Sequence, residues 1–336
     1  NVSPTHTYPT TGTYSVMLVA TSNNGCVDSA IKSVTIHPKP IVTFTTANVC
    51  FGDSVMTSNT SSISAGSMTY YWNFGDGSNS TSSSPSHLYA AAGTYTISLL
   101  ATSNNGCQNS YSTTVTVYPA PAASFNVSDA CYGYTIAFQN TSSVSSGSNT
   151  FAWDLGDGSS TNNVSPTHLY ASSGMYSAKL LATTDKGCVD SVAKNVSVHP
   201  EAISSFTASN VCDGDTVHFI NSSSVSSGTM SYLWNFGDGN GATAKDTNYI
   251  YSAPGTYIVK LTVTTDKGCA TTSSMNITIY PRASLAFTTN NMCDGNSAVF
   301  TNTTSVSNGS LNYIWDFGDN STSNNISPTH LYAATA

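Results

Sequence analysis

Charged side chains are scarce in this sequence. Lys, Arg, Asp and Glu together make up 8 % of the residues, whereas typical soluble domains carry about a quarter. The nine basic residues are not clustered and the net charge is −8, so neither nucleic acid nor an anionic membrane surface is expected as a partner. The surface must therefore consist mostly of Ser, Thr and Asn side chains.

Long apolar runs are also missing. No stretch approaches the roughly 20 residues that a membrane-spanning helix needs, and Asn1 does not begin a charged and then apolar signal segment. We expect a soluble chain without membrane insertion, in mature or excerpted form.

Catalytic motifs are lacking as well. The sequence contains no Gly-rich phosphate cradle and no Ser/His/Asp or Cys/His arrangement within one unit. We expect no enzymatic activity in these residues and no cofactor, which leaves open a catalytic domain elsewhere in a parent polypeptide.

The sequence does contain a repeat. Its tryptophans lie at positions 72, 153, 234 and 315, each 81 residues after the one before. A fixed period of this size predicts a tandem array. We expect complete domains at 39–119, 120–200 and 201–281, a partial unit with the last strands only at 1–38, and one with the first strands only at 282–336.

Around each tryptophan, large apolar residues alternate with small polar ones, as in Tyr70, Trp72 and Phe74. Period two predicts a half-buried strand, and the following Gly-Asp-Gly predicts a turn. In the first complete unit we expect strands at 41–46, 54–58, 70–74, 94–102 and 112–117, with a short polar edge at 80–84. Seven or so short strands without helical period predict an all-β sandwich. Its core is expected to contain Trp72, Trp153, Trp234, Trp315, Tyr95, Tyr176 and Tyr257.

The run from Trp72 to Gly77, followed by Pro85-Ser-His-Leu-Tyr89 and Gly93-Thr-Tyr-Thr-Ile97, resembles the PKD (polycystic kidney disease) domain. The resemblance covers essentially the whole chain and implies a tandem array of immunoglobulin-like β-sandwiches with an 81-residue period. Such arrays are similar to those of large bacterial surface and secreted proteins. The resemblance also implies an occasional calcium ion near the Gly-Asp turn, for which the weak candidate ligands are Asp76, Asp157, Asp238 and Asp319.

These aspartates also have a simpler interpretation, because an Asp in a turn commonly bonds its own backbone. The position three residues earlier holds Asn73, Asp154, Asn235 and Asp316, so a paired-carboxylate site would be missing from two copies. The histidines His6, His87, His168 and His330 share their place with Tyr249 in the third complete unit. Since tyrosine does not replace a metal ligand or a general base, we expect both sets of side chains to be structural.

Eight cysteines keep the same period in two series, Cys26, Cys107, Cys188, Cys269 and Cys50, Cys131, Cys212, Cys293. The sequence has no Cys-x-x-Cys pair and no His at ligand spacing beside them, which favours disulfides over zinc. Disulfides in turn predict an extracellular or cell-surface location.

The strand lengths predict which cysteines pair. In an immunoglobulin-like unit, the A–B turn with Cys50 and the F–G turn with Cys107 lie at opposite ends, roughly 25–30 Å apart, whereas a disulfide needs Cα atoms within about 7 Å. We therefore predict bonds between neighbouring units, Cys50 with Cys188 and Cys131 with Cys269. The remaining Cys26, Cys107, Cys212 and Cys293 are expected to pair outside this segment.

These features favour a structural segment of an extracellular fibre, stalk or adhesin, whose partners are further repeats or other copies of the same chain. Glycans are a further candidate partner. The alternative is a set of carbohydrate- or protein-binding accessory modules of a secreted hydrolase, which requires exposed aromatics outside the core pattern. The partial units need a neighbour in either case. The chain is an excerpt of a longer polypeptide, or the front half of one molecule is completed by the hairpin of the next.

Overall fold

The computed structural model describes residues 2–333. It is all-β, as predicted, and no helix in these residues could cross a membrane. The chain forms two compact units. The first comprises residues 1–127, 137–168 and 176–196, and the second comprises residues 128–136, 169–175 and 197–336.

The first complete repeat contains eight strands where the sequence predicts about seven. They are β3 (Phe44–Thr46), β4 (Val49–Cys50), β5 (Val55–Asn59), β6 (Met68–Asn73), β7 (Asn79–Ser80), β8 (Ser86–His87), β9 (Gly93–Ser103) and β10 (Gln108–Tyr118). One sheet has the order β4-β10-β9-β6-β7 and the other has the order β3-β5-β8. Phe44 and Val55 of the smaller sheet share one buried core with Trp72 and Leu99 of the larger sheet, so the repeat is a two-layer sandwich.

The first and last strands differ most from the expected ranges, whereas the bounds of β5, β6 and β9 lie within two residues of them. The first strand begins at Phe44, and the chain before it makes only an isolated bridge from Ile41 to Ser62. The last strand begins at Gln108 rather than at residue 112, because its polar start pairs with the end of β9. Strand β4 was not predicted. It pairs in parallel with the end of β10 and so places Cys50 opposite Tyr118.

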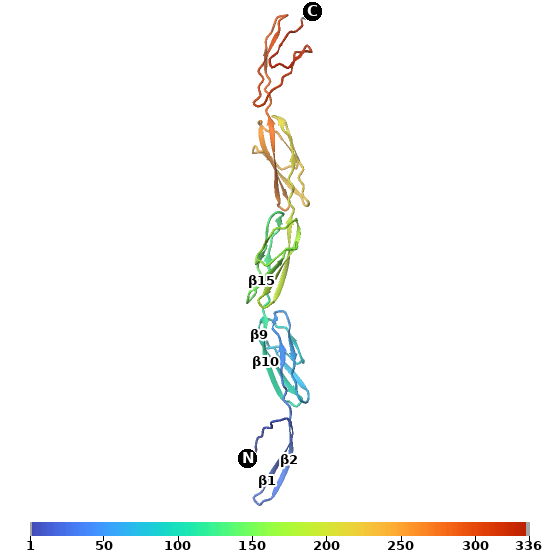
Figure 1. The fold of residues 1–336 in the computed structure, drawn as a ribbon, viewed down its shortest axis with the longest axis vertical. Coiled ribbons are helices and arrows are strands. Elements are labelled where there is room, and N and C mark those ends of the chain that lie inside the picture. Colours follow the sequence, from blue (N-terminus) through green and yellow to red (C-terminus); the bar gives the residue numbers. More distant parts are fainter. Residues whose placement is uncertain (1, 334–336) are drawn as a thin grey trace. The chain divides into compact units, whose positions relative to one another are not determined.

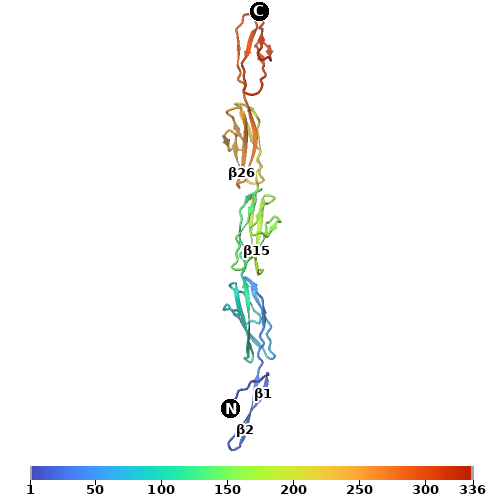
Figure 2. The same cartoon turned by 60° about the vertical axis from the view of Figure 1, so that its left-hand side comes forward.

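The other complete repeats follow the same plan. The second contains β11 (Phe125–Asn126), β12 (Ala130–Cys131), β13 (Ile136–Ala137), β14 (Gln139–Asn140), β15 (Asn149–Asp154), β16 (Ser160–Thr161), β17 (Thr167–His168), β18 (Gly174–Thr184) and β19 (Val189–His199). The third contains β20 (Phe206–Thr207), β21 (Val211–Cys212), β22 (Val217–Asn221), β23 (Met230–Asn235), β24 (Gly241–Ala242), β25 (Thr247–Tyr249), β26 (Gly255–Thr265) and β27 (Ala270–Tyr280). The large sheets have the orders β12-β19-β18-β15-β16 and β21-β27-β26-β23-β24. Figures 1 and 2 both label β15, and Figure 2 also labels β26.

Two incomplete repeats flank these three. Strands β1 (Gly12–Thr21) and β2 (Val27–Ile36) form an antiparallel hairpin alone, which is blue in Figure 1. The last repeat, which we call the half-repeat (284–333), contains β28 (Phe287–Thr289), β29 (Ala298–Asn302), β30 (Trp315–Asp316), β31 (Thr322–Ser323) and β32 (Thr329–His330). Within the described residues it has no counterparts of β26 and β27.

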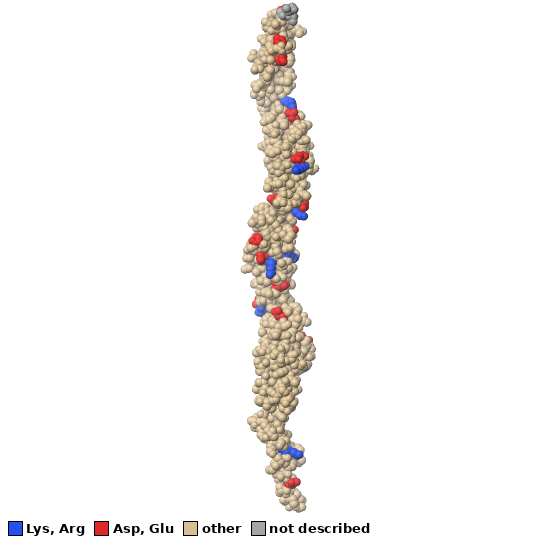
Figure 3. Space-filling view, turned by 90° about the vertical axis from the view of Figure 1, so that its right-hand side faces the viewer, with Lys and Arg blue, Asp and Glu red and all other residues tan. Residues whose placement is uncertain are grey.

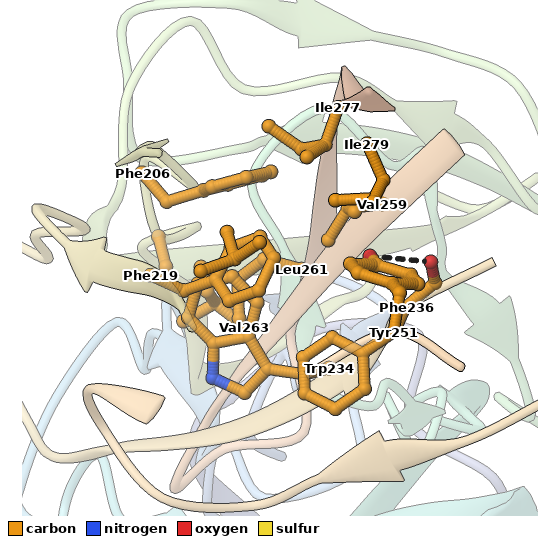
Figure 4. Packing of buried hydrophobic residues seen from close by; sticks show 12 residues of the cluster. Phe206, Phe219, Trp234, Phe236, Tyr251, Val259, Leu261, Val263, Ile277 and Ile279 are labelled. Carbon is orange, nitrogen blue, oxygen red and sulfur yellow. Dashed lines mark hydrogen bonds between the residues drawn. The ribbon is translucent and has the colours of Figure 1, made fainter. Parts of the chain in front are cut away.

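The core of each complete repeat is built around its tryptophan. Trp72, Trp153 and Trp234 are fully buried, and each indole N–H donates to a backbone carbonyl, for example that of Ala244 at 3.0 Å. Figure 4 shows Trp234 among the aromatic and aliphatic side chains of the third repeat. Trp315, in the half-repeat, is only partly buried.

The expected core tyrosines Tyr95, Tyr176 and Tyr257 are half-buried. The fully buried tyrosines are Tyr89, Tyr170 and Tyr251, which the strand pattern misses because they follow short strands or loops. In the first repeat, Tyr95 stacks on Tyr89 with ring centroids 3.9 Å apart, so it covers the core from outside.

The surface is poor in charge. Figure 3 shows a face on which basic and acidic side chains are few and scattered. The first complete repeat holds only Asp53 and Asp76 between residues 41 and 118, with no Lys, Arg or Glu. Hydroxyl and amide side chains therefore dominate the surface, as expected.

Candidate functional site

The Gly-Asp turn follows strand β6 and is held by its own side chains. Asn73 Oδ1 accepts a hydrogen bond from the backbone N–H of Gly75 at 2.8 Å, and Asp76 Oδ1 accepts one from Ser78 at 2.9 Å. Gly75 has a φ of 82°, and an added Cβ would lie 2.6 Å from the Thr96 carbonyl oxygen. Only glycine fits there, because positive φ and the close backbone both exclude a side chain.

The second carboxylate oxygen of this Asp contacts the recurring histidine. His87 Nε2 lies 2.7 Å from Asp76 Oδ2, and its ring stacks on Phe74 with centroids 4.3 Å apart. The Asp bond recurs between His168 and Asp157 in the second repeat, where Leu155 stands in place of Phe74. Both the Asp bond and the ring stacking recur at His330 in the half-repeat.

The third repeat explains why tyrosine can stand in place of histidine. The Tyr249 hydroxyl donates to Asp238 Oδ2 at 2.7 Å, and its ring stacks on Phe236 with centroids 4.1 Å apart. Histidine and tyrosine each supply a flat ring and a polar atom that reaches the Asp carboxylate. The position therefore needs a ring that stacks and bonds to the Asp, which agrees with the structural interpretation of the sequence.

These contacts hold the aspartates ionised. Burial alone would raise the pKa of Asp76, but the hydrogen bonds from His87 and from the Ser78 backbone outweigh it and leave the pKa below its usual value. The same balance lowers the pKa of Asp157 to about 2. Burial, followed by the charge of Asp76, raises the pKa of Tyr89 to about 12. A carboxylate with so low a pKa is not a proton donor at neutral pH.

The turn does not fit a calcium ion. Calcium takes six to eight oxygen ligands, whereas both oxygens of Asp76 already accept hydrogen bonds, one of them from the histidine. Between residues 2 and 333, no three His, Cys, Asp or Glu side chains are grouped so as to hold a metal. The equivalent Asp157, Asp238 and Asp319 have the same two kinds of partner.

The cysteines form the other candidate site, because two disulfides join consecutive repeats. Cys50 bonds Cys188 in the first compact unit, and Cys131 bonds Cys269 in the second, with Cα atoms 5.6 Å apart in both. These are the two pairs expected from the strand lengths. In each bond the cysteines are 138 residues apart, so an A–B turn is linked to the F–G turn of the following repeat.

Both turns have a fixed backbone. The A–B turn is closed by a bond from Asp53 N–H to the Cys50 carbonyl at 3.0 Å, and it is anchored by Phe51 N–H on the Tyr118 carbonyl at 2.7 Å. In the F–G turn, Cys188 N–H donates to Thr184 Oγ1 at 3.0 Å. Cys188 and Cys269 are fully buried, whereas Cys26, Cys212 and Cys293 are exposed free thiols and Cys107 is a half-exposed one.

Some aromatic side chains lie outside the core. Tyr134 is 63 % exposed and the nearby Tyr132 is also exposed. Within the second compact unit, Tyr132 lines a shallow cavity of about 430 Å³ together with Pro200 and Glu201. The alternating strand pattern did not reveal this cavity, because its residues come from loops.

The family model described as PKD domain matches residues 37–119, 118–199, 197–279 and 280–336. The pre-pro-metalloprotease PrtV of Vibrio cholerae is 30 % identical over 161 residues, which cover 47 % of this chain and 17 % of the protease. The collagenase ColA of Bacillus cereus is 42 % identical over 57 residues, which cover 17 % of this chain and 6 % of the collagenase. The chain thus spans less than a fifth of the length of these relatives.

Two solved structures are similar to single repeats. The PKD1 domain of Vibrio anguillarum Epp has 32 % identity and a TM-score of 0.23, and the match covers 24 % of this chain and 96 % of that domain. The PKD1 domain of V. cholerae PrtV has 34 % identity and a TM-score of 0.21, with 24 % and 98 % covered.

The four matched segments run from residue 37 to residue 336 and so include every described Gly-Asp turn and both disulfides. All four matches are to the PKD domain, a non-catalytic module. The chain belongs to the PKD domain family.

Proposed function

We propose that this chain is a structural segment of an extracellular fibre, stalk or adhesin, in which consecutive PKD repeats carry load. The observation that carries the proposal is the disulfide from the A–B turn of one repeat to the F–G turn of the next, present twice. Disulfides persist in oxidising compartments, which supports an extracellular location.

A second covalent connection limits how far a joint between two repeats can bend and twist. The backbone passes from Tyr118 to Ala122 through two prolines, Pro119 and Pro121, which stiffen the linker but leave one pivot. The Cys50–Cys188 bond adds a second attachment. Two attachments restrict both bending and twisting of the joint.

The free Cys107 provides a matched control for a test. In small-angle X-ray scattering, the Cys50→Ser/Cys188→Ser double variant should show a broader distribution of particle dimensions than the oxidised parent chain. Cys107→Ser should leave the distribution unchanged, because this cysteine has no disulfide partner here. Equal profiles for all three proteins would show that the disulfide does not restrict the joint and would remove the basis of the proposal.

A second candidate function is an accessory module that holds carbohydrate or protein for a secreted hydrolase. The exposed Tyr132, which lines the shallow cavity, and the exposed Tyr134 two residues further along the chain favour it, since flat aromatic faces bind sugars and peptides. Pull-down on cellulose and chitin tests this function. Saturable binding that Tyr134→Ala abolishes, and Tyr71→Ala on another exposed surface preserves, would favour the accessory module over the structural segment.

A further inference from the structure

The two disulfides interlock along the chain. Cys50 bonds Cys188 and Cys131 bonds Cys269, each pair with a sequence separation of 138. Cys131 lies between Cys50 and Cys188 in the sequence, and Cys188 lies between Cys131 and Cys269. Each bond therefore closes a loop that contains one cysteine of the other bond.

The covalent chain between the outermost of these cysteines has two junctions and three connecting segments. The first junction is the Cys50–Cys188 bond, and the second junction is the Cys131–Cys269 bond. Three stretches of backbone run from one junction to the other, namely the first segment (51–130), the middle segment (132–187) and the last segment (189–268). The middle segment is the shortest of the three.

We propose that these junctions make residues 50–269 one covalent network with two properties that a linear chain lacks. The network stays continuous after a cut at any single peptide bond, because such a cut opens one segment and leaves two others between the junctions. The network also limits how far these residues extend under tension, because the shortest segment sets the limit. The inference rests on the proposed structural function for its role, and on the two cysteine pairings for its existence.

The limit on extension follows from the length of the middle segment. An extended chain spans at most about 3.5 Å per residue. With both disulfides, residues 50–269 can therefore lengthen only to about 200 Å, however many repeats unfold. With either disulfide alone, the shortest route has the length of one 81-residue period and reaches about 280 Å. With neither disulfide, the same residues reach about 770 Å.

The junctions are protected while the repeats are folded. Cys188 and Cys269 are each 1 % exposed, and their partners Cys50 and Cys131 are half-buried. A thiolate must reach a sulfur atom of a disulfide in order to reduce it, so burial slows the reduction of both junctions. The network therefore persists in the folded chain under conditions in which an exposed disulfide is reduced.

Two of the connecting segments contain exposed turns where a protease can cut. Lys186 in the middle segment and Lys267 in the last segment lie in F–G turns, and their side chains are 53 % and 56 % exposed. The first segment contains no Lys or Arg. Trypsin can therefore open the middle and last segments but not the first, so it probes whether the first segment alone keeps the junctions connected.

Limited digestion with trypsin, after the free thiols are blocked by alkylation, tests the continuity of the network. Cuts after Lys186 and Lys267 leave three fragments of the oxidised chain, which should still migrate as one species on a denaturing gel without reductant. Reduction should separate them. In Cys50→Ser/Cys188→Ser the fragment 187–267 should be released without reduction. Cys107→Ser should behave like the parent chain, because this thiol is unpaired.

Single-molecule force measurements on the whole chain test the limit on extension. Because the residues outside the network are the same in every protein, differences in contour length report the network alone. Compared with the oxidised parent, Cys50→Ser/Cys188→Ser should extend about 80 Å further, and the fully reduced chain about 570 Å further. Cys107→Ser should extend as far as the parent.

An oxidised parent chain that extends as far as the reduced one would overturn the inference. Release of the fragment 187–267 from the oxidised parent without reduction would overturn it as well. Scattering profiles that do not change when Cys50 and Cys188 are replaced would instead remove the basis of the proposed structural function and leave the covalent network in place.

Discussion

The third repeat and the half-repeat carry the same motif in different surroundings. In both, the Gly-Asp turn is intact, since Asp238 and Asp319 each accept a backbone N–H at 3.0 Å. The indole N–H bonds of Trp234 and Trp315 are also alike, at 3.0 and 2.9 Å. The burial of the two tryptophans differs: Trp234 is fully buried and Trp315 is not.

The difference between the two repeats distinguishes the local contacts that form the turn from the long-range contacts that form the core. The turn and the indole bond join residues within about ten positions and form without the last two strands. The core forms only when β26 and β27 supply Val259, Leu261 and Ile277 from the other end of the repeat. The fold of one repeat therefore depends on contacts of high sequence separation, which the recurring motif does not provide.

Trp234→Ala should have the largest effect on this comparison. It removes a fully buried indole and should lower the free energy of unfolding of the third repeat by about 3–5 kcal/mol. Trp315→Ala, in the half-repeat, should change local stability by less than about 1 kcal/mol because the indole is already partly hydrated. Amide hydrogen exchange read by mass spectrometry reports both values in the whole chain.

Equal losses at the two tryptophans would contradict this view of the core. They would mean that the half-repeat folds as firmly as a complete repeat.

Removal of one joint disulfide should have the next largest effect. Cys131→Ser/Cys269→Ser should destabilise the second and third repeats by about 2–4 kcal/mol, since the bond closes a long loop of the unfolded chain. Cys293→Ser is the control at the equivalent turn of the half-repeat, and no change is expected in the monomer because this thiol is unpaired. Thermal unfolding followed by circular dichroism distinguishes the two variants, and a similar shift in both would contradict the prediction.

Strand pattern and repeat register predicted much of this structure from the sequence. The sandwich class, the tryptophan core and the pairing of Cys50 with Cys188 depend on periodicity and strand length, which are visible along the chain. Tyr89 was not predicted as a core residue because it lies outside the alternating strands, although a tyrosine recurs at this position every 81 residues.

The contact between His87 and Asp76 also could not be predicted from the sequence alone. His87 lies on β8 of the smaller sheet, and Asp76 lies in the turn after β6 of the larger sheet. Only the fold brings their side chains within 2.7 Å. The replacement by Tyr249 predicted that the position is structural, but it did not identify the Asp as the partner. The short strand β4 was missed for a related reason, because two residues carry no periodicity.

A smaller effect is expected at the buried tyrosine. Tyr251→Phe removes the hydroxyl that donates to the Phe236 carbonyl at 2.9 Å and leaves that buried carbonyl without this partner, at a cost of about 1–2 kcal/mol in the third repeat. Figure 4 draws this bond. Tyr332→Phe removes the equivalent bond of 3.1 Å in the half-repeat, but water can replace the exposed hydroxyl, so the change should stay below about 0.5 kcal/mol. Hydrogen exchange at β23 and β30 reads the two effects, and an equal loss would show that water does not reach the half-repeat core.

The smallest difference between a complete repeat and the half-repeat is expected in the pKa of the turn aspartates, because the hydrogen bonds of these turns are local. The pKa of Asp157 is lowered to about 2, where bonds from Ser159 and His168 outweigh burial, and that of Asp319 is lowered to about 2 by Ser321 and His330. Each folded pKa lies below the unfolded value of about 3.9. The stability contributed by each ionised carboxylate is therefore fully present above about pH 4 and is lost as the pH falls through 2.

Carboxyl carbon chemical shifts, followed by NMR from pH 5 to pH 1.5, should show Asp157 and Asp319 titrating together near pH 2. Asp157→Asn should remove part of the acid-induced loss of stability in the second repeat and leave the third repeat unchanged. If Asp319 instead titrates near its unfolded value, the half-repeat turn needs the covering strands after all, and the division between local turn and long-range core would have to be redrawn.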